Sequence, residues 1–143
     1  MSAQLVNRFF NEVISQKKIA VLDEILHPSF HSNHFPIPPG SDKAGFVEGT
    51  KGLLSAFPDI RITINDQFEK TGKVFSYGTW TATHKDMFQG IPPTNKQVRV
   101  EFMDIWQESD GKLRENWVVM DIIGLMIQLG VVPPPGTKPS PST

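Results

Sequence analysis

Residues 96–121 read KQVRVEFMDIWQESDGKLRENWVVMD, and this stretch predicts two long antiparallel strands joined by a tight turn. Ser109-Asp110-Gly111 is typical of a hairpin turn. One parity of the first strand holds Val98, Val100, Phe102, Asp104 and Trp106. Met103 and Ile105 make the other parity apolar as well, so the direction of Asp104 stays open and a hydrogen-bonded structural aspartate is an equal alternative.

The segments before this hairpin predict helices first and strands afterwards. Apolar residues at helical spacing predict a helix over residues 5–14, with Ser2 as its cap, and a shorter helix is predicted over residues 19–26. A short strand is expected around residues 30–34, and Ser41 or Asp42 caps a helix that runs to about Phe57. Alternation then predicts strands over 60–65 and 74–88, with a turn at 71–73.

A short apolar helix, IIGLMIQL at 122–129, closes the predicted domain. The order of helices and then hairpins indicates an α+β fold, in which a cone-shaped, curved antiparallel sheet wraps around the N-terminal helices. We expect one domain over residues 1–131 and a Pro-rich flexible tail over 132–143. Such a cone leaves a cavity between helices and sheet that suits a small apolar ligand.

Composition excludes several classes of function. The formal net charge is -1 and no basic cluster is present, which argues against nucleic acid as a partner. With no cysteine, thiolate metal sites and cysteine nucleophiles are excluded. No signal peptide and no membrane-spanning apolar stretch is recognisable, so we expect a cytoplasmic protein without a membrane partner.

Asp121 is the most conspicuous polar residue, because it ends a strand and is followed at once by large apolar residues. Counted along the strand, it shares a face with Leu113, Trp117 and Val119, so we expect it to point inward. Burial would raise the pKa of its carboxyl and make it a proton carrier near neutral pH. The alternative is an aspartate that caps the final helix, and the two interpretations are compatible.

The remaining candidates would bind rather than react. His34 lies where it could bond a ligand at the mouth of the cone, and His84 shares an inward parity with Trp80; in both cases a solvated histidine is the alternative. The histidines do not form a metal-ligand pattern, so no metal is expected. Most of the aromatic residues belong to a core, but some suit the wall of a cavity for a flat substrate: Trp80, Phe102, Trp106 and Trp117.

Three motifs resemble the SnoaL-like polyketide cyclases of the nuclear-transport-factor-2-like superfamily. They are THKDMFQGIPPTNKQV, DIWQESDGKLRENW and VVMDIIGLMIQLG, and the resemblance extends from near residue 5 to about 131. It implies the cone-shaped α+β fold, a homodimer packed sheet to sheet, and cofactor-free intramolecular aldol ring closure. The acid/base aspartate of the family falls on Asp121, and Asn116 stands where a histidine is common.

The sequence thus predicts a cyclase or isomerase-type enzyme that acts on a hydrophobic, carbonyl-containing small molecule through Asp121. One alternative is a non-catalytic binding protein for an apolar metabolite. Another is epoxide hydrolysis, for which Asp104 is the obvious second carboxylate. A homodimer is expected because Phe75, Tyr77, Met103 and Ile105 would otherwise leave an apolar patch on the outer face of the sheet.

Overall fold

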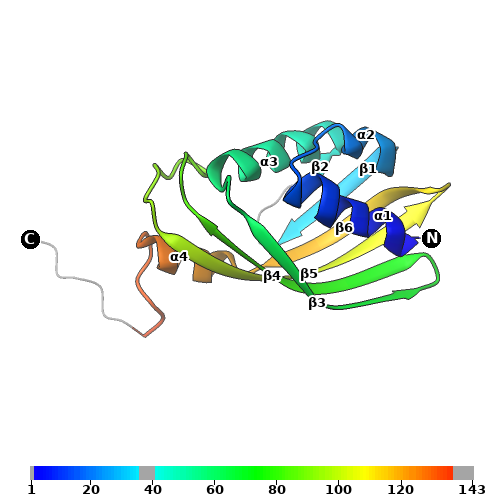
Figure 1. Ribbon diagram of the computed structural model, residues 1–143. Helices are drawn as coiled ribbons and strands as arrows, with labels where there is room; N and C mark the ends of the chain where they lie inside the picture. The colour runs from blue at the N-terminus through cyan, green and yellow to red at the C-terminus, as the bar shows by residue number, and fades with distance from the viewer. Residues whose placement is uncertain (1, 36–40, 137–143) are drawn as a thin grey trace, which may run out of the picture.

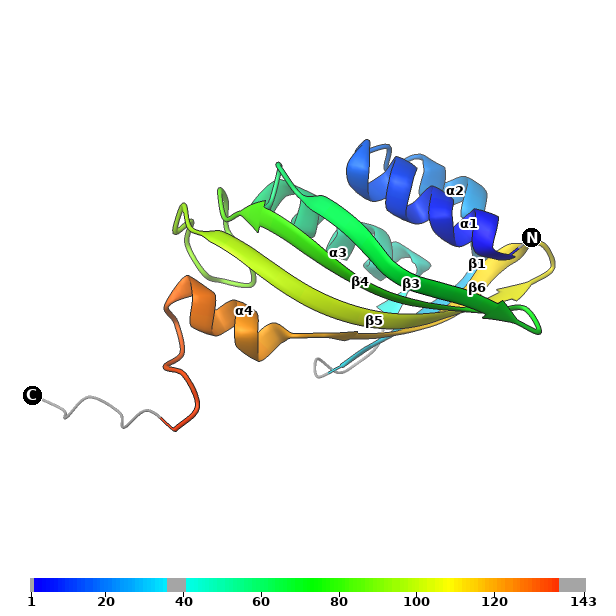
Figure 2. The ribbon, with the colours of Figure 1, turned by 60° about the horizontal axis from the view of Figure 1, so that its bottom comes forward.

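The computed structural model describes residues 2–35 and 41–136 of the chain. Helices cover one face of a curved sheet (Figures 1 and 2). The helical layer begins with α1 (Ser2–Arg8), which continues directly into a π-helical segment, η1 (Phe9–Ser15). Two further helices follow, α2 (Val21–Ile25) and α3 (Lys43–Ala56). The predicted N-terminal helix is therefore confirmed in extent, although its second half has the wider π-helical turn.

The predicted N-terminal cap of α3 forms, whereas the predicted cap of α1 does not. The Asp42 side chain accepts a hydrogen bond from the Gly45 amide at 2.8 Å, as expected for an N-cap of α3. Ser2, in contrast, is not a cap. It lies within α1, is buried, and donates its hydroxyl to Glu108 Oε1 at 2.8 Å, so it joins the helix to the sheet.

The sheet has six strands in the order β2-β1-β6-β5-β4-β3. Their bounds are β1 (Leu26–Phe35), β2 (Ser41–Asp42), β3 (Arg61–Lys70), β4 (Lys73–Thr83), β5 (Gln97–Ser109) and β6 (Lys112–Met120). All neighbours are antiparallel except β1 and β6, which run parallel. The expectation of a purely antiparallel sheet is wrong at this pair. Between β1 and β6 the chain passes through β2, α3, β3, β4 and β5, and such a long crossover permits parallel pairing.

The hairpin of residues 96–121 forms as predicted. In β5 the inward parity from Val98 to Trp106 is buried, whereas Met103 and Ile105 are exposed on the other face. Asp110 and Gly111 both have positive φ, at 56° and 78°, which is the backbone that a two-residue hairpin turn needs. The same geometry occurs at Thr71 and Gly72 in the β3–β4 turn.

The return strand β6 contains one extra residue. Gln107 pairs with Glu115 and Glu108 pairs with Leu113, so Arg114 has no partner on β5. This is a β-bulge, and it reverses which face each later side chain occupies. The inner face consequently passes from Leu113 to Asn116, both completely buried.

The helices and the inner face of the sheet share one aromatic core. Phe9 on η1 and Phe46 on α3 both pack against Trp106 of β5, with ring centroids at 4.9 Å and 6.1 Å. The final helix, α4 (Ile122–Leu129), lies at the end of the sheet away from α1 (Figure 2) and buries Leu125 and Leu129. Within residues 2–35 and 41–136, no helix is both long and apolar enough to cross a bilayer.

Candidate active site

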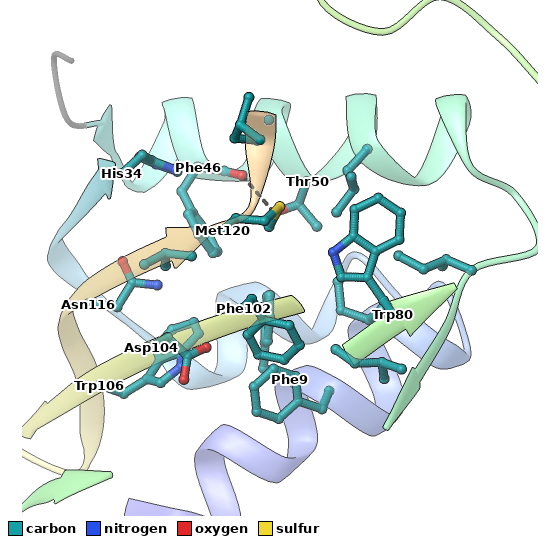
Figure 3. A pocket seen from close by; sticks show the side chains of 18 of the residues that line it. Phe9, His34, Phe46, Thr50, Trp80, Phe102, Asp104, Trp106, Asn116 and Met120 are labelled. Carbon is teal, nitrogen blue, oxygen red and sulfur yellow. Dashed lines mark hydrogen bonds between the residues drawn. The ribbon is translucent and has the colours of Figure 1, made fainter. Parts of the chain in front are cut away.

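A cavity of about 230 Å³ lies between the helices and the inner face of the sheet. Helix residues from η1 and α3 form one wall, and β4, β5 and β6 form the other (Figure 3). Its wall is mostly apolar and includes the aromatic residues Phe9, Phe10, Phe46, Trp80, Phe102 and Trp106. Ligand pockets for drug-sized molecules span about 300–1,000 Å³, so this cavity suits a compact ligand.

Asp104 is the carboxyl group of this cavity. It stands between Phe102 and Trp106 on the inward parity of β5 and is only 4% exposed. Its Oδ1 atom is buried and has no hydrogen-bond partner among the described residues. Burial raises the pKa of the Asp104 carboxyl to about 7, while the Trp106 and Ser76 side chains act in the opposite direction. The carboxyl group therefore exchanges a proton readily near neutral pH.

Asn116 supplies a hydrogen-bond donor beside this carboxyl group. Its Oδ1 accepts the hydroxyl hydrogen bond of Ser32 at 2.5 Å, and both residues are completely buried. Its Nδ2 is buried and has no partner in the described part of the chain. Because Ser32 occupies the oxygen, the amide nitrogen is the group left for a ligand.

Strand register explains why these residues meet. Asp104 pairs with Ser76 on one side and with Val118 on the other, and Val118 in turn pairs with His34. Asn116 pairs with Trp106, so it lies one step diagonally from Asp104 on the same face. Figure 3 shows the two side chains on neighbouring strands at the same end of the cavity.

His34 lines this end of the cavity, as expected for a binding residue. One ring nitrogen, Nε2, lies 3.2 Å from the Ser41 hydroxyl. Burial lowers the pKa of His34, and the nearby His31 lowers it further. The ring is therefore neutral at neutral pH and serves as a hydrogen-bonding group.

Asp121 does not lie in the cavity. It is exposed, and its Oδ1 accepts a hydrogen bond from the Gly124 amide at 2.8 Å, so the capping interpretation is confirmed. The expected inward direction is wrong because the count along β6 took no account of the bulge at Arg114. Met120 and Ile122, on either side of Asp121, are the residues that line the cavity.

Two of the expected binding residues are also placed differently. Because of the bulge at Arg114, Trp117 lies on the outer face of β6, as Asp121 does, and does not line the cavity. His84 is buried as expected, but it is not a wall residue. Its Nδ1 accepts a hydrogen bond from the Thr94 amide at 3.2 Å, which ties the loop before β5 to the end of β4. Trp80, Phe102 and Trp106 are cavity residues as predicted.

The sequence pointed to neither of the two small polar residues that support the site. Ser76 sits between apolar inward residues of β4, and Ser32 lies in a segment rich in proline and serine. For Ser76, the signal available was its inward parity with Val74 and Trp80. For Ser32 no local signal exists, because its partner Asn116 is 84 residues away. No three His, Cys, Asp or Glu residues are grouped to hold a metal in the described ranges.

This chain is similar to one known protein family and to solved structures of proteins named after that family. The family model for SnoaL-like polyketide cyclases matches residues 4–129. A SnoaL-like protein from Jannaschia sp. CCS1 is 19% identical and has a TM-score of 0.84 over 92% of this chain and 93% of that chain. AclR of Streptomyces galilaeus, a candidate hydroxylase, is 23% identical, with a TM-score of 0.83 over 97% and 85%.

A third solved structure shares more of the sequence. A candidate polyketide cyclase from Acidithiobacillus ferrooxidans is 28% identical, with a TM-score of 0.76 over 90% of this chain and 94% of that chain. No curated protein sequence matches the chain. The predicted family resemblance and the predicted α+β cone are both confirmed.

Proposed function

Because the chain belongs to the SnoaL-like polyketide cyclase family, we propose that it moves a proton beside a carbonyl group of a small apolar substrate and so closes a ring by intramolecular aldol addition. We assign the acid/base role to Asp104. The observation that carries this assignment is a buried carboxyl group, with a pKa of about 7, on the wall of an aromatic cavity.

The reaction needs one group that both takes and returns a proton. The Asp104 carboxylate removes a proton from the carbon beside a carbonyl, and the C–H electron pair becomes an enolate. The enolate carbon then forms a bond to a second carbonyl carbon, whose π electrons pass to its oxygen. Protonated Asp104 returns its proton to that oxygen. A pKa near the working pH serves both directions, because neither protonation state is strongly favoured.

Asn116 stabilises the negative charge that this reaction creates. Its Nδ2 carries N–H groups without a partner among the described residues, and it lies on the face that holds Asp104. A donor fixed in place before the reaction stabilises an enolate oxygen strongly in surroundings of low polarity. Ser32 holds the amide in this orientation through its 2.5 Å hydrogen bond.

The aromatic walls supply proximity. A substrate chain folded within a cavity of about 230 Å³ keeps its two reacting carbonyl groups close together. Because both groups belong to one molecule, the cavity contributes by holding the chain in its reactive conformation, which lowers the entropy cost of ring closure. The wall also keeps water away from the enolate, which favours ring closure over return of a proton from solvent.

Deuterium exchange at the carbon beside the carbonyl of 2-tetralone tests the proton-transfer step, because this ketone is small, flat and apolar. NMR in D2O follows the loss of the proton signal. We expect the wild-type chain to accelerate exchange and Asp104→Asn to lower the rate by about 100-fold or more, the usual contribution of a general base. Asp121→Asn is the matched control and should exchange at the wild-type rate, because Asp121 lies outside the cavity.

Two results would contradict the assignment. Equal rates for wild type and Asp104→Asn would remove Asp104 from the reaction, and loss of exchange in Asp121→Asn would return the role to the helix cap. If 2-tetralone binds without any exchange in the wild-type chain, the protein is a binding module for apolar compounds.

We also propose that the chain forms a homodimer through the outer face of the sheet. Met103 and Val119 pair across β5 and β6 and are 51% and 55% exposed. Ile105, at 38% exposure, pairs with Phe75 of β4 on the same face. A continuous apolar patch of this kind marks an interaction surface, and a second copy of the same face would cover it.

A further inference from the structure

Trp80 occupies a part of the cavity that the proposed reaction does not use. The residue lies on β4, is 2% exposed, and contributes to the cavity wall. Figure 3 shows its indole nitrogen on the side of the ring that faces the cavity, across from Asp104 and Asn116. This Nε1 is buried and has no hydrogen-bond partner among the described residues. A buried donor without a partner is costly to the fold, so its presence needs an explanation.

The distance between the two polar regions follows from the strand register. Ser76 pairs with Asp104, and Trp80 pairs with Val100, so Trp80 lies four residues along β4 from the position beside Asp104. At a rise of about 3.3 Å per residue, the Cα atoms of Ser76 and Trp80 are roughly 13 Å apart. A single small functional group cannot reach both regions, whereas a fused-ring system can.

No described residue accepts a hydrogen bond from the Trp80 indole nitrogen. Phe57 packs edge-on against the indole ring, with centroids 5.0 Å apart. Apolar residues make up the nearby wall, including Ile60 and Ile62. Thr50 and Gln89 are polar residues of the cavity wall, but neither accepts a hydrogen bond from the indole N–H; the Thr50 hydroxyl donates to the Phe46 carbonyl at 2.8 Å. An oxygen atom of a ligand is thus the group that would satisfy the indole N–H.

We propose that Trp80 Nε1–H is a specificity-determining donor that binds a second oxygen of the substrate. The substrate class that fits is a flat, fused-ring compound with an oxygen function at each end. One oxygen belongs to the reacting carbonyl beside Asp104 and Asn116, and the other, a carbonyl or hydroxyl oxygen, accepts from Trp80. This inference rests on the proposed function, since it takes the Asp104 end as the reacting end.

A pair of probes separates the two ends. 2-Naphthol carries one hydroxyl group and resembles an enol, and 2,6-dihydroxynaphthalene adds a second hydroxyl at the opposite end of the same ring system. Isothermal titration calorimetry gives the Kd of each probe. We expect the wild-type chain to bind the diol about five- to tenfold more tightly, the value of one hydrogen bond to a neutral donor.

Trp80→Phe keeps an aromatic ring and removes the N–H, so the diol should lose its advantage and the two Kd values should become equal. Comparing the two probes within each variant cancels the change in ring size, because both probes share the same ring system. Trp117→Phe is the matched control, since Trp117 does not line the cavity, and it should keep the wild-type preference. Asp104→Asn should weaken both probes and leave their ratio unchanged.

The possible failures are distinguishable. If the wild-type chain binds both probes equally, or if Trp80→Phe keeps the preference for the diol, the Trp80 contact is wrong and the Asp104 proposal is unaffected. If Asp104→Asn binds 2-naphthol as the wild type does, the Asp104 end is wrong, whatever the outcome at Trp80. If neither probe binds the wild-type chain, the cavity does not accept this class of compound and the Trp80 proposal fails, while the exchange of 2-tetralone still decides the Asp104 proposal.

Discussion

Replacing Asp104 by asparagine should change how the stability of the fold depends on pH. In the wild-type chain, burial raises the pKa of the carboxyl from 3.8 to about 7. Between these two values the folded state holds a proton that the unfolded state has released. The wild-type chain is therefore most stable, as far as this group is concerned, below about pH 4, and it loses stability as the pH rises toward 7. Asparagine carries no charge at any pH and removes this dependence.

The size of the effect follows from the difference between the two pKa values. It is about 3, and each unit corresponds to about 1.4 kcal/mol, so the total is of the order of 4 kcal/mol. Asp104 is 4% exposed, so solvent screens little of this energy. We expect the unfolding free energy of Asp104→Asn, relative to wild type, to increase by about this amount from pH 4 to pH 8.

Urea unfolding of both proteins at pH 4.5, 6 and 8 measures this difference. Comparing the variants at each pH cancels the titration of all other groups, and any constant effect of the amide on packing drops out as well. Asp66→Asn removes an exposed carboxylate of β3 and serves as the control. A difference between Asp104→Asn and wild type that stays constant across the three pH values would refute the claim that burial keeps this carboxyl protonated.

Four further changes test the placement of individual residues. Asp121→Ala removes the α4 cap and should lower the unfolding free energy by about 1 kcal/mol, whereas Asp121→Asn keeps an acceptor and should not, as urea unfolding would show. Gly124→Ala would put a Cβ atom 2.1 Å from Asp121 Oδ2, so a loss of about 1 kcal/mol or more is expected, and an unchanged midpoint would contradict this contact. Ser32→Ala releases the Asn116 amide and should slow 2-tetralone exchange while costing about 1–3 kcal/mol of stability; wild-type exchange would show that the amide needs no support. Ile105→Lys places a charge in the proposed dimer face and should give a monomer in sedimentation velocity, where a wild-type monomer at micromolar concentration would disprove the dimer.

The sequence alone was sufficient wherever the structure depends on neighbouring residues. The alternation from Val98 to Trp106 predicted that these residues share one face of β5, and the structure shows that this face is the inner one and carries Asp104 into the cavity. Turn residues such as Asp110 and Gly111, and the caps Asp42 and Asp121, were equally readable, because they act within a few residues of their own position. The motifs were specific enough to predict the family and, through it, the curved α+β fold.

Only the tertiary structure decided which of two aspartates faces the cavity. Successive side chains of a strand lie on opposite faces. The extra residue at Arg114 therefore places Asn116, instead of Trp117, on the inner face and turns Asp121 outward. The sequence of β6 reads equally well with or without that bulge, because both of its faces carry large apolar residues. The bulge arises where β6 pairs with β5. On its other side β6 pairs in parallel with β1, and this pairing brings Ser32 to Asn116. These contacts join positions far apart in the chain, and no local pattern encodes them.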